Sequence, residues 1–222
     1  VPVEELFPGH GAALVKSEMA ELLAAYRVSL ASDRKHLFDQ YRFVHMARKV
    51  VGVGSVGTRA WMTLLLGRDD NDPLLLQFKE ANASVLEPYA GKSPYENQGQ
   101  RVVTGQRLLQ SASDIFLGWT HGRPGHDYFV RQLRDMKMSA PIEADTSAQQ
   151  VLLYAELCGR TLAHAHAKSG DAALISGYLG KSGAFDQAIG EFAMAYADQN
   201  AKDHSALVAA VKSGRVKALL EE

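Results

Sequence analysis

Cysteine is almost absent from this chain, since Cys158 is the one cysteine among 222 residues. A single cysteine excludes a disulfide framework and a cysteine-rich zinc site. No apolar run approaches the roughly 20 residues that a membrane-spanning helix requires. The first residues are acidic, unlike the basic start of a secretory signal peptide. These absences predict a cytoplasmic chain with no membrane span.

An excess of charge of either sign is also lacking. The chain has 24 Lys and Arg against 25 Asp and Glu, for a formal net charge of −1. A broad surface for nucleic acid or for an anionic membrane requires a marked positive excess, so we expect neither partner. The chain starts at Val1 rather than Met, and we therefore expect it to be part of a longer protein.

The order of the predicted elements indicates an α+β protein in three parts. Residues 1–42 form an N-terminal helical arm: an irregular lead-in to Gly11, then a helical pattern over 17–40 that Ser32 or Asp33 interrupts and caps. Residues 43–135 read as β–β–β–α–β–β, and 136–222 as a hinge followed by helices. The expected strands are 43–53, 58–66, 74–81, 115–119 and 128–133. The expected helices of the later parts are 100–112, 148–168, 185–197, 205–211 and 216–220.

A glycine-rich turn lies between the first two predicted strands. Gly52, Gly54 and Gly57 form Gly-x-Gly-x-x-Gly, and Lys79 follows on the third strand. Glycines let backbone N–H groups approach phosphate oxygens, because no Cβ stands in the way. A lysine on a neighbouring strand adds a positive charge for the same phosphates. Together the two features indicate a nucleotide site.

The glycine motif has three interpretations. In a dinucleotide-binding fold it joins a strand to a helix, with an acidic residue such as Glu80 about 20 residues further on. In a kinase small lobe it lies in a β-hairpin, with a lysine on the third strand. Without a ligand, it is an ordinary turn. Residues 58–66 precede a dense turn cluster and are short for a crossover helix, which favours the hairpin.

Five segments of the chain resemble the bacterial family called domain of unknown function 2252. They are Ala47–Thr58, Asp72–Glu87, Gly99–Gly118, Phe129–Lys137 and Leu162–Asp171. That family resembles protein kinases and aminoglycoside phosphotransferases, and its function is not established. The resemblance implies a kinase-like small lobe with a five-stranded antiparallel sheet, followed by a helical portion. It also implies an ATP site, in which the phosphate loop is formed by Gly52, Gly54, Ser55 and Gly57, the phosphate lysine is Lys79, and the hinge beside the adenine contains Met136 and Met138.

The resemblance also shows what this chain lacks. Longer members carry a Gly-Asp-x-His-x-x-Asn catalytic loop and an aspartate-rich metal motif before the glycine loop. Here Gly170-Asp171 is followed by Ala-Ala-Leu-Ile-Ser, and Gly-Asp-x-His does not occur. Phosphoryl transfer requires metal ligands and a group that positions the nucleophile. We therefore expect this chain to be inactive alone, and to bind Mg²⁺ only with the missing segment.

The lysine also lacks its usual partner. In active kinases a glutamate on the following helix pairs with it, but the helix over 100–112 has no carboxylate, and Thr104 occupies the place where the family carries Glu. We expect Lys79 to be mobile, or buried with a lowered pKa, and ATP affinity to be poor.

The missing segment should also leave apolar helical surface exposed, which predicts a homo-oligomer or docking to an N-terminal segment. The acceptor substrate of the expected phosphotransferase is unknown. A non-catalytic binding or scaffold module is the alternative function, and a dinucleotide-binding oxidoreductase is the second alternative.

Several other residues receive structural interpretations. His164 and His166 are two apart on a helix and point in different directions, so we expect no metal site there. Cys158 is expected to be a buried core thiol, and His121 and His126 to be solvated beside a turn. Arg131 and Arg134 could meet a phosphate or a carboxylate, but an ordinary ion pair is the simpler expectation.

Overall fold

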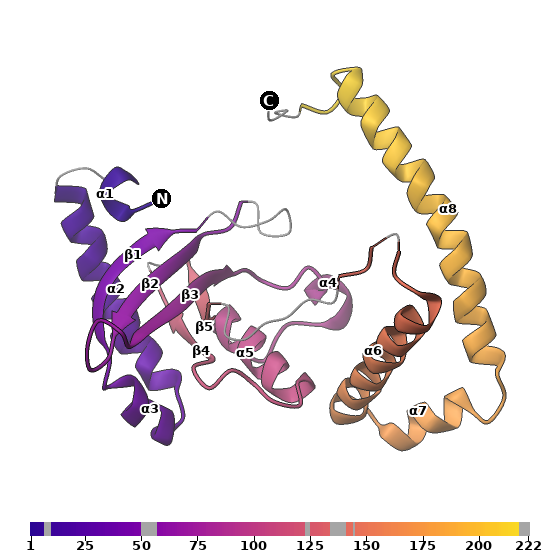
Figure 1. Ribbon diagram of the computed structural model, residues 1–222, viewed down its shortest axis with the longest axis horizontal. Helices are drawn as coiled ribbons and strands as arrows, with labels where there is room; N and C mark the ends of the chain where they lie inside the picture. Colours follow the sequence, from indigo (N-terminus) through magenta and orange to yellow (C-terminus); the bar gives the residue numbers. More distant parts are fainter. Residues whose placement is uncertain (7–9, 50–56, 123–124, 134–140, 144, 218–222) are drawn as a thin grey trace. The chain divides into compact units, whose positions relative to one another are not determined.

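The structure is a computed structural model, and it describes residues 1–6, 10–49, 57–122, 125–133, 141–143 and 145–217. The chain divides into two compact units, Val1–Ser169 and the residues from Gly170 onward. The first unit contains the sheet and most of the core, and the second is entirely helical (Figure 1). Each is described here on its own.

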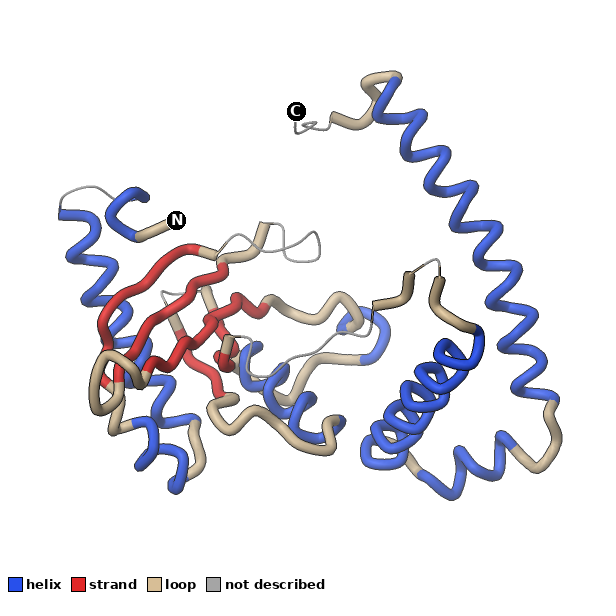
Figure 2. The backbone as a smooth tube through the Cα atoms, viewed as in Figure 1, coloured by secondary structure: helices blue, strands red, loops and turns tan. Residues whose placement is uncertain are grey.

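The first unit is built on a five-stranded antiparallel sheet, seen as the red tubes of Figure 2. Its strands are β1 (Arg42–Arg48), β2 (Ala60–Leu66), β3 (Pro73–Ala81), β4 (Gly118–His121) and β5 (Asp127–Gln132). They lie in the order β1-β2-β3-β5-β4, so β1 to β3 form a meander and β4 joins the edge beside β5. The predicted β–β–β–α–β–β order and the α+β class are confirmed.

The segment after the glycine motif is a strand. β2 pairs antiparallel with β1, and the Lys49 amide donates to the Ala60 carbonyl at 2.9 Å, which closes the base of the hairpin. Trp61 and Thr63, residue types that favour extended backbone, lie here among apolar neighbours, and the turn cluster at 67–72 ends the strand. The hairpin interpretation is therefore the one that matches the structure around Gly57.

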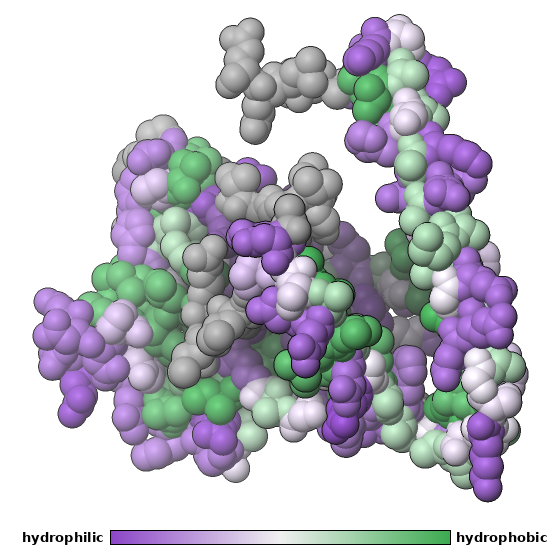
Figure 3. Space-filling view, turned by 45° about the vertical axis from the view of Figure 1, so that its right-hand side comes forward, coloured by the Kyte–Doolittle hydropathy of each residue, from purple (hydrophilic) through white to green (hydrophobic). Residues whose placement is uncertain are grey.

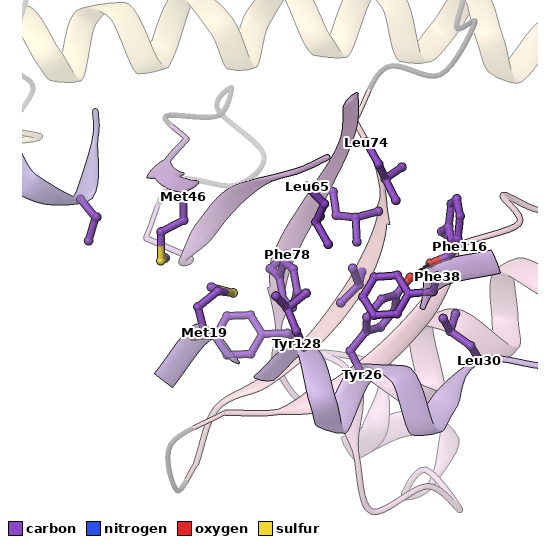
Figure 4. Close-up of a cluster of buried hydrophobic side chains, with 14 residues drawn as sticks. Met19, Tyr26, Leu30, Phe38, Met46, Leu65, Leu74, Phe78, Phe116 and Tyr128 are labelled. Atoms are coloured by element: carbon purple, nitrogen blue, oxygen red, sulfur yellow. Dashed lines mark hydrogen bonds between the residues drawn. The ribbon is translucent and has the colours of Figure 1, made fainter. Parts of the chain in front are cut away.

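The core lies between the sheet and α2 (His10–Ser29). Tyr26 and Phe78 are both fully buried, and their rings meet edge to face with centroids 6.1 Å apart. The Tyr26 hydroxyl donates to the Phe116 carbonyl at 2.5 Å, inside the cluster of side chains in Figure 4. This contact ties α2 to the segment leading into β4, and the Ser29 hydroxyl, which accepts from the Trp119 amide, adds a second tie.

The N-terminal residues are more ordered than the sequence predicts. α1 (Val3–Leu6) forms where an irregular lead-in was expected, and α2 begins at His10. Pro2 bridges Ala47 at the edge of β1, and the Arg48 amide donates to the Val1 carbonyl at 2.9 Å. These long-range contacts with a sheet edge order the first residues, which is why local pattern does not reveal them.

The helical arm breaks where the sequence indicates. α3 (Ser32–Phe38) follows α2 after a short interruption. The expected side-chain cap at Ser32 or Asp33 is wrong, because the N-cap is Ala31 and makes no side-chain hydrogen bond. An ion pair between Arg27 and Asp39 spans the two helices instead.

Two elements between β3 and β5 differ in position from the prediction. The expected loop over 88–99 contains a short helix, α4 (Glu87–Ala90), and ends where α5 (Gln98–Leu109) begins. β4 starts at Gly118 rather than at Ile115, because Phe116 and Leu117 turn into the core instead of pairing in the sheet.

The later helices are longer than expected. α6 (Ala148–Ser169) matches the predicted helix, and α7 (Ala172–Leu179) is an additional one that Asp171 caps through the Leu174 amide at 2.9 Å. The two helices expected over 185–197 and 205–211 form one, α8 (Ala184–Lys212), because the polar residues between them include no glycine or proline. Residues 213–217 are turns and bends rather than helix, and the rest of the expected 216–220 helix lies outside the described residues.

Helices α6 and α8 leave apolar side chains exposed. No residue of α6 is buried, so the expected burial of Cys158 in a core is wrong, although its side chain is partly covered. Along α8, Phe185, Ile189, Phe192 and Tyr196 recur at spacings of four, three and four and remain 40–62% exposed. Figure 3 shows such apolar residues in green among hydrophilic ones in purple on the visible surface.

Candidate functional site

Two of the seven predicted site residues lie in the part of the chain that the structure describes. Gly52, Gly54, Ser55, Met136 and Met138 lie outside the described residues. Gly57 is described and has φ of 84°, a left-handed conformation that favours glycine. Lys79 is described on β3, opposite Ala60 of the hairpin. The structure therefore places the base of the glycine hairpin next to the lysine.

Lys79 lies on the face of the sheet opposite α2. Its neighbour Phe78 points into the core, and successive side chains of a strand alternate between faces. The Lys79 ammonium stands 5.9 Å from the centroid of the Phe129 ring, its partner on β5. Burial first, and the charge of Arg131 second, lower the pKa of Lys79. This direction agrees with the lowered pKa expected for a partly buried Lys79.

Arg131 is the second cation on this face. Its register partner is Gln77, and its Nε and Nη2 atoms both lie 3.4 Å from the Gln77 Oε1 atom. Gln77 is two residues from Lys79 and has only 3% of its surface exposed. The ion pair expected for Arg131 is not found with any described carboxylate. Lys79 and Arg131 therefore stand on adjacent strands without a described acidic partner.

Glu80 anchors the base of the hairpin. Its carboxylate is 6% exposed and accepts from the Arg59 amide at 2.8 Å and from the Arg59 guanidinium at 3.1 Å. The Nδ1 atom of His126 lies 3.0 Å from the same carboxylate. Glu80, the acidic residue that a dinucleotide site would use to bind a ribose, is therefore already hydrogen-bonded to Arg59 and His126. His126 is a partner in this cluster rather than a simply solvated side chain.

Helix α5 lies on the same face as Lys79. The Arg107 guanidinium stands 5.8 Å from the centroid of the Trp119 ring, and Trp119 is opposite Phe129 in the sheet. Arg107 also donates to the Leu117 carbonyl, which holds the helix on β4. α5 contains no acidic residue, and Thr104 is half-buried in it.

A buried polar network fixes the start of α5. Asn97 is 3% exposed, and its Oδ1 atom accepts from the Gln100 amide at 2.9 Å as the N-cap. Its Nδ2 atom donates to the Thr120 carbonyl and to Asp127, which also accepts from the Gln98 amide and pairs with His121 at 2.8 Å. An asparagine directly before a helical pattern is a typical N-cap, and the expectation of a helix over 100–112 did not include it.

Metal ligands do not gather in the described part of the chain, where no three His, Cys, Asp or Glu side chains lie close enough to hold an ion. His164 and His166 are both exposed on α6. A pocket of about 550 Å³ lies at the start of α6, away from Lys79, and its walls include Glu143, Asp145 and Tyr154. Two carboxylates without a cation among its lining residues repel phosphate, so Lys79 and Arg131 remain the candidate site.

Residues 8–210 match the family model described as an uncharacterized protein conserved in bacteria (DUF2252). The chain belongs to this family. The match includes the whole sheet and nearly all of α8. No curated protein and no solved structure matches the chain. Within the described residues, no helix is long and apolar enough to cross a membrane.

Proposed function

We propose that this chain is the nucleotide-binding portion of a kinase-like phosphotransferase, with ATP as the ligand. The carrying observation is the pair of cations on one face of the sheet, Lys79 and Arg131, at the base of a glycine-rich hairpin. The pKa of the half-buried Lys79 ammonium is lowered by burial first and by the charge of Arg131 second, and a bound anion would offset both effects. A lysine on the strand that follows a glycine-containing hairpin supports the proposal, because kinase small lobes also carry their phosphate lysine on the third strand.

The described residues support nucleotide binding better than they support phosphoryl transfer. Phosphoryl transfer requires carboxylates that hold Mg²⁺ and a group that positions the acceptor. The described residues bring no such carboxylate group together. We expect ATP-dependent phosphorylation of any acceptor by this chain alone to be undetectable. Such activity, abolished by Lys79→Met, would contradict that expectation.

Calorimetric titration tests the proposal. ATP, with and without Mg²⁺, is compared with NAD on the wild-type chain and on Lys79→Met. Lys92→Met is the matched control, because Lys92 is exposed on a loop and its loss changes the net charge equally. We expect ATP to bind the wild type and the control, and Lys79→Met to weaken it at least tenfold, the loss of about one charge-assisted hydrogen bond. Binding of NAD alone, or none of either, would refute the proposal.

A non-catalytic binding module is the second candidate, supported by the exposed apolar residues of the helices. A 29-residue helix with an exposed apolar stripe gains stability by covering it, and large exposed patches mark partner surfaces. Sedimentation of the wild type should show self-association that Phe192→Ser reduces, with Gln187→Ser as control. A monomer that binds no hydrophobic dye would count against this candidate.

A dinucleotide-dependent oxidoreductase is disfavoured, since residues 60–66 form a strand.

A further inference from the structure

A single lysine suffices for the proposed nucleotide site, yet the sheet supplies a second cation beside it. Arg131 stands diagonally across from Lys79 on the neighbouring strand, on the same face. Its hydrogen bonds to Gln77 are long, 3.4 Å each, and they go to a neutral amide oxygen. Such weak contacts offset little of the cost of holding two like charges together.

Gln77 has a donor that the fold does not use. Because its Oε1 atom faces Arg131, its Nε2 atom points elsewhere, and it has no hydrogen-bond partner among the described residues. The side chain is nevertheless 97% buried, as its exposed fraction is 3%. Among the residues that the structure describes, no fully inaccessible side-chain polar atom lacks a hydrogen-bond partner, so the Gln77 Nε2 atom is not fully enclosed. Two cations and one open amide donor thus share the same face of β3 and β5.

We infer that Arg131 and Gln77 act with Lys79 as one site for an oligophosphate chain, and that this site binds it without a divalent metal ion. The inference rests on the proposed function and deepens it. In a kinase, Mg²⁺ bridges the phosphates and a glutamate pairs with the lysine. Here α5 offers no carboxylate to pair with Lys79, and the guanidinium of Arg131 on the neighbouring strand supplies a second positive charge for the phosphates. Arg131 contacts the phosphates, and Gln77 orients Arg131.

The ligand class follows from the charges. Two cations with no described counterion match the triphosphate of ATP or a free tripolyphosphate, each of which carries several negative charges. A guanidinium also presents paired donors that fit two phosphate oxygens at once. Chelating the metal should therefore leave binding intact, because the protein supplies the neutralising charge.

The experiment is calorimetric titration of ATP in EDTA and in excess Mg²⁺, with tripolyphosphate and adenosine as separate ligands. We expect wild type to bind ATP in EDTA at least as tightly as in Mg²⁺, and tripolyphosphate, but not adenosine, to compete. Arg131→Gln should weaken binding in EDTA at least tenfold, whereas Arg131→Lys, which keeps the charge, should lose less. Arg160→Gln is the control, because it removes an arginine of the exposed helix α6.

Gln77→Glu provides an independent test with little change of shape. Its carboxylate would lie between the two cations, offset one of their two positive charges, compete with the ligand for their donors and abolish oligophosphate binding, while thermal stability stays at or above the wild-type value. ATP binding that requires Mg²⁺ and is lost in Lys79→Met would overturn this inference and leave the proposed function standing. Equal binding by Arg131→Gln and Arg160→Gln would do the same. Failure to bind any phosphate ligand would overturn both.

Discussion

Two glycines of helix α5 provide a matched test of how closely this helix packs on the sheet. Gly99 lies in its first turn, where an added Cβ would stand 2.2 Å from the Tyr128 carbonyl oxygen and 2.6 Å from its carbon. Both are backbone atoms of β5, so they cannot rotate away. Gly105 lies in the same helix, where an added Cβ would meet no atom within 4 Å.

The two alanine substitutions should therefore act in opposite directions. Overpacking costs about 1–3 kcal/mol, and we expect Gly99→Ala to reach the upper part of that range because the clash is with backbone. Gly105→Ala should stabilise by roughly 0.5–1 kcal/mol, because alanine favours a helix more than glycine does. The expected difference between the variants is about 3 kcal/mol, or roughly 6–12 °C in melting temperature for a chain of this size.

Urea unfolding followed by circular dichroism measures both variants against the wild type. The difference should lie in the midpoint, with an unchanged slope. Gly99→Ala should also weaken nucleotide binding. A displaced helix start would shift Asn97 and, through it, Asp127 on β5, the strand that pairs with Lys79. If the two variants have the same stability, or if Gly99→Ala is the more stable, the inferred close packing of α5 against β5 is wrong.

Three further predictions concern the core, the helix cap and pH. Tyr26→Phe removes the hydroxyl that donates to the Phe116 carbonyl and should cost about 1–2 kcal/mol in urea unfolding; an unchanged midpoint would show that the bond contributes nothing. Asn97→Ala should cost about 1–2 kcal/mol or more, because a cap and buried partners are lost together; a variant as stable as wild type would contradict the network. Because the pKa of Lys79 is lowered on folding, the unfolded chain binds more protons between that pKa and about 10.4, so stability should rise with pH across this window. Lys79→Met should flatten that rise in urea midpoints measured from pH 7 to 10, and a parallel profile would refute the assignment.

Local sequence pattern is enough to predict those helices and strands whose formation depends on neighbouring residues. Apolar runs bounded by turn formers predict β2 and β3, and helical spacing predicts α5 and α6. The glycine motif and the position of Lys79 on the third strand can also be predicted from the sequence, because strand alternation and turn chemistry are properties of neighbouring residues. The two residues of that prediction that the structure describes, Gly57 and Lys79, lie at the base of the hairpin and on the strand beside it.

Contacts between residues distant in sequence appear only in the folded structure. The pairing of Val1 with Arg48 orders α1, and the engagement of His126 by Glu80 joins residues 46 positions apart. The neighbours of Lys79 were hidden for the same reason: the register between β3 and β5 places Arg131 opposite Gln77, 54 residues away. Periodicity reveals which face of a strand a residue occupies, but only the pairing of strands fixes which charges meet on that face, because a shift of register by one residue moves every side chain to the other side.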